Sequence, residues 1–187
     1  MGLLVYGLVT LQIGMALNGT FALLVTFVPG LIRREYGYTM DVGIVLWLTL
    51  AVFLHSLGSV ALYGWFSWYD SLTHTVSSIV VAGIGYALFR AIERHTDDLD
   101  VPSEFRAMFI IVFVLAAGVF WEILEFASEL SATVFGIPAP LAVLGIDDIV
   151  TDLIFNVVGA VIVAAFGTGY VSGVSGFIRR QFVSDDG

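Results

Sequence analysis

The chain alternates long apolar stretches with short polar segments, and the apolar stretches are too long for helices in the core of a soluble protein. A helix needs about 20 apolar residues to cross a bilayer. Five stretches meet this requirement, at residues 3–32, 42–63, 71–90, 107–130 and 145–166. Residues 167–176 are rich in Gly and Ser and too short to cross again. The pattern predicts an all-α fold, a single integral membrane domain over residues 1–187 that forms a polytopic bundle with about five transmembrane helices.

The basic residues predict the orientation of this bundle. All seven are arginines, and with five spans they fall on one side of the membrane: Arg33, Arg34, Arg90, Arg94, Arg106, Arg179 and Arg180. Arginine and lysine accumulate in cytoplasmic loops. We therefore expect a multi-pass protein of the cell membrane with its N-terminus outside and its C-terminus inside. The first stretch has no positive start and no small-residue cleavage site, so we expect a retained span rather than a signal peptide.

Composition supports the membrane assignment and excludes several functions. The 187 residues are 59% hydrophobic, and their mean hydropathy is +0.99. The absence of cysteine excludes disulfides and thiolate metal ligands. There is no basic patch for nucleic acid, and no internal repeat of the kind that builds many transporters. A net charge of −9 without any lysine is typical of salt-adapted proteins.

Seven acidic residues gather in the outer half of the predicted bundle. They are Asp70, Glu122, Glu125, Glu129, Asp147, Asp148 and Asp152. Helical spacing places Asp70 and His74 on one face, because side chains four residues apart are neighbours. Asp148, Asp152 and Asn156 form a second polar stripe at the same spacing, which ends beside Gly159, where another helix could approach closely. His55 lies at a similar depth in the second stretch.

Carboxylates in a bilayer are costly, so these side chains should face one another. Each costs at least ~2.5 kcal/mol on insertion scales, and intramembrane acids usually face the bundle interior and pair. Several together also repel, which favours protonation or a bound cation. No arginine lies at this depth to neutralise them. The sequence therefore predicts an outward-facing Asp/Glu/His pocket.

Three motifs in order resemble the uncharacterised YjdF-like family of inner-membrane proteins. They are Trp-Tyr-Asp-x3-His at residues 68–74, Trp-Glu-x2-Glu-Phe at 121–126, and Asp-x3-Asp-x3-Asn-x2-Gly-Ala at 148–160. The motifs also resemble, more distantly, those of VanZ-like membrane proteins, where glutamine stands at the position of Glu125. The resemblance implies a membrane protein and carries no established reaction.

The residue types in the pocket suit a metal-assisted hydrolase or transferase that acts on a lipid or lipid-linked substrate. Oxygen and nitrogen ligands suit Mg²⁺, Mn²⁺ or Zn²⁺, and such an ion can activate water. In this hypothesis His74 is a ligand or general base oriented by Asp70, and Glu125 is a proton shuttle. The expected ligands are Glu122, Asp148, Asp152 and His55, with Asn156 as a further polar residue of the site.

Two other functions stay open at this point. A proton- or cation-coupled transporter would also use clustered intramembrane acids. The inner halves of the last three spans are almost wholly apolar, however, which indicates a dead-end pocket rather than a path. In a structural protein, Asp70 would only cap its helix and the other acids would only join helices by hydrogen bonds. The sequence identifies neither the substrate nor the oligomeric state.

Overall fold

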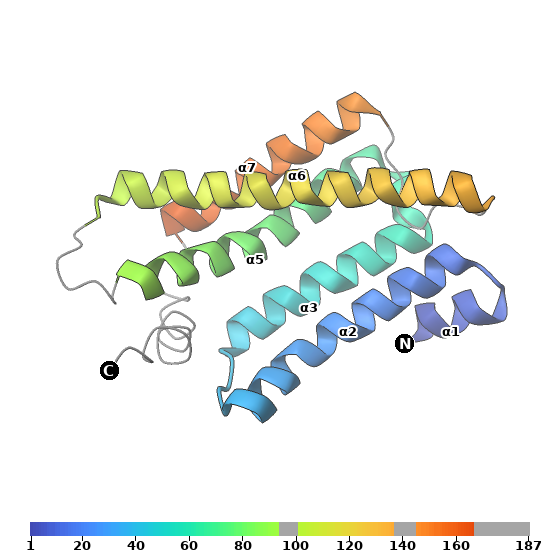
Figure 1. Cartoon of the computed structure of the whole chain (residues 1–187), viewed down its shortest axis with the longest axis horizontal. Coiled ribbons are helices and arrows are strands. Elements are labelled where there is room, and N and C mark those ends of the chain that lie inside the picture. The colour runs from blue at the N-terminus through green and yellow to red at the C-terminus, as the bar shows by residue number, and fades with distance from the viewer. Residues whose placement is uncertain (94–100, 137–144, 167–187) are drawn as a thin grey trace.

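The computed structural model describes residues 1–93, 101–136 and 145–166, and all regular secondary structure in this part of the chain is helical. The helices, shown in Figure 1, are α1 (Gly2–Val9), α2 (Ile13–Tyr36), α3 (Val42–Leu57), the π-helical turn η1 (Gly58–Leu62), α4 (Tyr63–Trp65), α5 (Ser67–Glu93), α6 (Ser103–Phe135) and α7 (Ile146–Phe166). Five helical stretches within it are long and apolar enough to cross a membrane. The predicted all-α polytopic bundle is confirmed. Arg94, Arg179, Arg180 and residues 167–176 lie outside the described residues.

The expected uninterrupted first span over residues 3–32 is wrong, because the chain turns back on itself near its start. The turn lies between α1 and α2, where Leu11 has a left-handed backbone with φ of 56°. Two glycines allow the two helices to touch: a Cβ on Gly7 would lie 2.3 Å from the backbone of Ala16, and one on Gly19 would lie 2.4 Å from the backbone of Leu4. The span is therefore α2 alone, and α1 packs along its first half.

The second and third spans are joined more tightly than the sequence indicates. α3, η1 and α4 form one apolar helical stretch from Val42 to Trp65, and α5 follows after the extended residue Phe66. Because α5 begins at Ser67, four residues before the expected start of the third span, Tyr69 lies inside a helix. Its side chain is buried, and its hydroxyl donates to the carbonyl oxygen of Leu54 at 3.0 Å. Tyr69 therefore ties α5 to α3.

α5 is the central helix of the bundle, and it packs against α3, α6 and α7 (Figure 1). The buried core contains mainly small and branched residues from α5, α6 and α7: Ala82, Tyr86, Ala87, Ile110, Val114, Ala160 and Val163. Gly159 of α7 makes the predicted close approach, since a Cβ there would lie 2.6 Å from the backbone oxygen of Thr75 on α5. Small residues of this kind are common where membrane helices pack closely. The close packing of α5 and α7 fixes the relative position of their polar ends.

The opposite end of α5 is fastened to α6 by an ion-pair cluster. Glu93 is buried and pairs with Arg90 of its own helix and with Arg106 of α6, whose Nη2 lies 2.8 Å from Glu93 Oε1. Two of the arginines that predict the orientation are thus partnered by a buried carboxylate. This cluster and the core hold the three C-terminal helices in one register.

Candidate cation site between α5 and α7

The structure brings together three of the predicted site residues, Asp70 and His74 from α5 and Asp152 from α7. Nε2 of His74 lies 3.8 Å from Oδ1 of Asp70 and 3.5 Å from Oδ2 of Asp152. One possible ligand atom from each residue lies within 4.8 Å of the other two. Ligand atoms lie about 2.0–2.6 Å from a bound ion, so two ligands on opposite sides of it are up to about 5 Å apart. The spacing of these atoms therefore suits a cation with two carboxylates and one imidazole.

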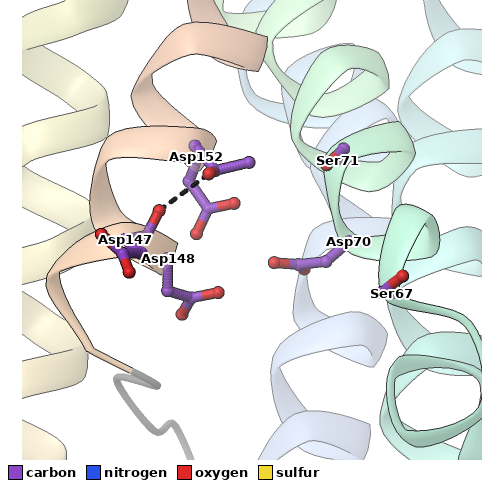
Figure 2. Close-up of a pocket in the computed structure, with 7 residues that line it drawn as sticks. Ser67, Asp70, Ser71, Asp147, Asp148 and Asp152 are labelled. Carbon is purple, nitrogen blue, oxygen red and sulfur yellow. Dashed lines mark hydrogen bonds between the residues drawn. The ribbon is translucent and has the colours of Figure 1, made fainter.

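An open cavity of about 320 Å³ leads to this group. Its lining comes from the first turns of α5 and α7 and consists of Ser67, Asp70, Ser71, Asp147, Asp148, Thr151 and Asp152. Figure 2 shows Asp70 on one wall and Asp148 and Asp152 on the other, with their carboxylates directed into the space between the helices. Asp152 is almost fully buried, whereas Asp147 is exposed. The cavity is strongly acidic and has no basic residue among the described residues that line it.

Glu122 of α6 is a buried carboxylate on the side of α6 that packs against α7. It is 7% exposed, and neither of its side-chain oxygens has a hydrogen-bond partner. The packing of α6 on α7 gives its register: a Cβ on Gly118 would lie 2.7 Å from the amide of Asn156. The two helices are antiparallel, so one turn outward on each places Glu122 level with Asp152. A buried carboxylate without a partner is costly, which gives Glu122 a strong requirement for a proton or a cation.

The other predicted site residues lie outside the three-residue group: Glu122, Asp148, Asn156, His55 and Glu125. His55 Nδ1 is 2.9 Å from the Tyr63 hydroxyl, and its ring packs edge-on against Trp121 at 6.4 Å. Glu125 is partly buried on α6, one turn after Trp121. Neither residue belongs to the group that could hold an ion. Asn156 is buried, one turn inward from Asp152.

Two residues that sequence reasoning missed, Tyr63 and Thr73, connect His55 to the acidic group. The Tyr63 hydroxyl donates to Oγ1 of Thr73 at 3.3 Å. The Thr73 hydroxyl in turn donates to the backbone oxygen of Asp70 at 2.8 Å and lies 3.5 Å from its Oδ1. The only local signal is that Thr73 follows Asp70 by three residues, a spacing at which a hydroxyl can return to the backbone. No pattern in the sequence predicts the contact with Tyr63.

The depth of the site follows from its position in the helices. At about 1.5 Å per residue, Asp70 lies about 5 Å from the start of α5, and Asp152 about 9 Å from the start of α7. The group therefore occupies the end turns of two helices, where the bundle opens, and not the middle of the bundle. Asp70 in the first turn of α5, and Asp147 and Asp148 in the first turn of α7, also interact favourably with the helix dipoles, which stabilises both helices without any ligand.

Comparison with known proteins places the chain in a family. Residues 1–173 match the family described as "Predicted membrane protein (DUF2238)", and the chain belongs to it. This match confirms the assignment to membrane proteins that the apolar stretches predict. No curated protein and no solved structure matches the chain.

Proposed function

We propose that this member of the DUF2238 family is a multi-pass protein of the cell membrane that binds one divalent cation at Asp70, His74 and Asp152 and uses it in a hydrolase or transferase reaction. The single observation that carries the proposal is the convergence of two carboxylates and one imidazole within 4.8 Å. The substrate class is a lipid or lipid-linked molecule whose polar group enters the cavity from the outer leaflet. Mg²⁺, Mn²⁺ and Zn²⁺ all accept this donor set.

The buried Glu122 supports a cation rather than a purely structural cluster. Hydrogen-bonded acids that only joined helices would each have a polar partner, whereas both oxygens of Glu122 lack one. It lies outside the three-residue group, and its position level with Asp152 makes it, in the proposal, a further carboxylate close to the ion. Asp148, on the facing wall of the cavity, either completes the coordination or orients a water. His74 is a ligand, and Glu125, near Tyr63, is the proposed proton shuttle.

The packing below the site favours an enzyme over a transporter. A transported ion needs a polar path through the bundle, but the core between α5, α6 and α7 consists of apolar and small side chains that pack closely. Ala82, Ala87 and Ala160 are fully buried there. The cavity therefore ends inside the bundle, as expected for a site that receives a substrate and releases a product on the same side. We propose that this side is the outer one, with the N-terminus outside and the C-terminus inside.

The three motifs that resemble those of YjdF-like and VanZ-like proteins contribute residues to the proposed site. The Asp-x3-His motif and the Asp-x3-Asp motif contribute all three residues of the group. The Trp-Glu-x2-Glu motif contributes Glu122 and Glu125. We infer that proteins with these three motifs share the cation site, and that Glu125 in place of glutamine distinguishes this chain from the VanZ-like proteins.

The test is cation-dependent stability of the purified protein in lipid nanodiscs. Metal is removed with a chelator, and thermal unfolding is followed with Mg²⁺, Mn²⁺, Zn²⁺ or no ion. Ligand linkage predicts about 2.7 kcal/mol of stabilisation at an ion concentration 100 times the dissociation constant. We expect Asp152→Asn and His74→Gln to abolish this stabilisation by the ion. Glu129→Gln is the matched control, because Glu129 is an exposed acid of α6 outside the cavity.

Three results separate the alternatives. A response in wild type and Glu129→Gln that is lost in Asp152→Asn supports the site, and cation-dependent release of polar groups from lipids in the same nanodiscs then supports the enzyme. Cation uptake by sealed proteoliposomes without such release would support a transporter instead. No response to any cation, with Asp152→Asn folded and equally stable, would contradict the proposed site.

A further inference from the structure

We propose that Tyr63 is a positioning residue for Asp70, an inference that rests on the proposed cation site. The Tyr63 hydroxyl holds Asp70 in place through Thr73, and His55 anchors Tyr63. His55 therefore acts on the site from a distance and is not a ligand. The chain of contacts runs from His55 Nδ1 to the Tyr63 hydroxyl at 2.9 Å and on to Thr73 Oγ1 at 3.3 Å. It ends at Asp70, where Thr73 donates to the backbone oxygen at 2.8 Å.

The hydrogen bonds that connect His55, Tyr63, Thr73 and Asp70 all run in one direction from donor to acceptor. The Thr73 hydrogen is used on Asp70, so the Thr73 oxygen accepts from Tyr63. The Tyr63 hydrogen is then used on Thr73, so the Tyr63 oxygen accepts from His55. His55 must carry its proton on Nδ1 for this to occur, because a neutral imidazole donates from one nitrogen only. Each group thereby fixes the orientation of the next, and the series ends at the backbone oxygen of Asp70, with the Asp70 carboxylate Oδ1 3.5 Å from the same Thr73 hydroxyl.

The backbone around Tyr63 is built to support this contact. η1 is a π-helical turn immediately before Tyr63, and such turns inside α-helices frequently occur at functional sites. Gly58, the first residue of that turn, lies against the Tyr63 ring, where a Cβ would be 2.3 Å from Cζ, the carbon that carries the hydroxyl. Only glycine leaves the ring in its present position. Asn18 of α2 also donates to Ser59 in the same turn at 3.3 Å, which ties the turn to α2.

These hydrogen bonds differ from surface hydrogen bonds because their residues are wholly or partly buried. Thr73 is 3% exposed, and Tyr63 and His55 are half-buried between α3, α5 and α6. Water therefore competes little for these hydrogen bonds. Residues that orient a metal ligand from behind typically change metal affinity 10- to 100-fold when they are removed. We expect the Tyr63 hydroxyl to act in this way on Asp70.

The experiment measures Mn²⁺ affinity by electron paramagnetic resonance in nanodiscs for wild type, Tyr63→Phe and Tyr69→Phe. Tyr69→Phe is the matched control: it removes the same hydroxyl from the neighbouring ring, 5.8 Å away, but that hydroxyl binds Leu54 and not Thr73. The expected result is an about 10-fold weaker affinity for Tyr63→Phe and no change for Tyr69→Phe. Thr73→Val should weaken binding at least as much, and Thr73→Ser should restore it.

A second readout tests the chain without any cation. The protein has three histidines, so ¹⁵N-histidine labelling gives a simple spectrum in which His55→Gln assigns the His55 signals. Wild type should show a protonated Nδ1 on His55, and Tyr63→Phe should shift it, whereas Tyr69→Phe should not. Equal Mn²⁺ affinity in wild type and Tyr63→Phe, or a His55 spectrum unchanged by Tyr63→Phe, would overturn the inference. Wild-type protein that binds no Mn²⁺ would instead contradict the proposed function, and the shifted His55 signal would still report the hydrogen-bonded chain.

Discussion

Gly159→Ala tests the claim that close packing of α5 on α7 assembles the site. The new Cβ would lie 2.0 Å from Oγ of Ser78, which can rotate away, and 2.6 Å from the backbone oxygen of Thr75, which cannot. The second distance is 0.8 Å short of the 3.4 Å at which ordinary contact begins. The helices must therefore separate by up to about 0.8 Å, and overpacking of this kind costs about 1–3 kcal/mol.

The same separation reaches the site, because Gly159 and Asp152 lie on the same helix two turns apart. The distance from His74 to Asp152, now 3.5 Å, would increase by a similar amount. Gly159→Ala should therefore lower both the free energy of unfolding, measured by titration with a denaturing detergent, and the stabilisation by Mn²⁺.

Gly83→Ala is the matched control for this substitution. Gly83 lies within α5, the helix against which Gly159 packs, but a Cβ there meets no atom within 4 Å. Alanine should leave stability unchanged or raise it by up to about 1 kcal/mol through its higher helix propensity. If Gly159→Ala is as stable as wild type and binds Mn²⁺ equally well, the reasoning from close helix packing is refuted.

Three further predictions concern other parts of the molecule. Glu93→Gln leaves Arg90 and Arg106 without their buried carboxylate. It should lower the free energy of unfolding, measured by detergent titration, by on the order of 3 kcal/mol. An unchanged value would mean that the ion-pair cluster does not stabilise the fold. Tyr69→Phe should cost about 1 kcal/mol in the same measurement, because it removes the hydrogen bond to the α3 backbone, and a neutral result would contradict that contact. Because the chain has no cysteine, Ser67→Cys and Ser103→Cys report topology directly. An impermeant maleimide added to intact cells should label only Ser67→Cys. Labelling of Ser103→Cys alone would show that the orientation is the opposite of the one proposed.

The fold was largely predictable because the bilayer imposes a simple requirement on each span. Long apolar stretches predict helices, and four of the five expected spans correspond to long helical stretches in the structure. The first span was wrong because apolar residues continue through the turn at Leu11, so hydropathy carries no signal of a break. The close approach of α7 to α5 at Gly159 was predictable, since a glycine that ends a polar stripe leaves room for another helix.

The candidate site was predictable only in part. Spacing along one helix brings Asp70 to His74, and the stripe on α7 indicates that Asp152 faces inward. The contact between them depends on the rotation of α5 against α7, which periodicity alone does not give. His55 was expected as a ligand because its depth matches, but depth does not fix direction. In the structure His55 contacts Tyr63, which follows a π-helical turn, and neither feature has a sequence signature as clear as helical spacing.

The most direct measurement of the central claim is pulsed electron paramagnetic resonance of Mn²⁺ bound to the protein in nanodiscs. The account predicts one Mn²⁺ per chain, with a ¹⁴N coupling from the imidazole of His74 that disappears in His74→Gln and persists in His55→Gln. Mn²⁺ bound without a nitrogen coupling, a coupling that survives in His74→Gln, or no bound Mn²⁺ at all would contradict a cation site built from Asp70, His74 and Asp152.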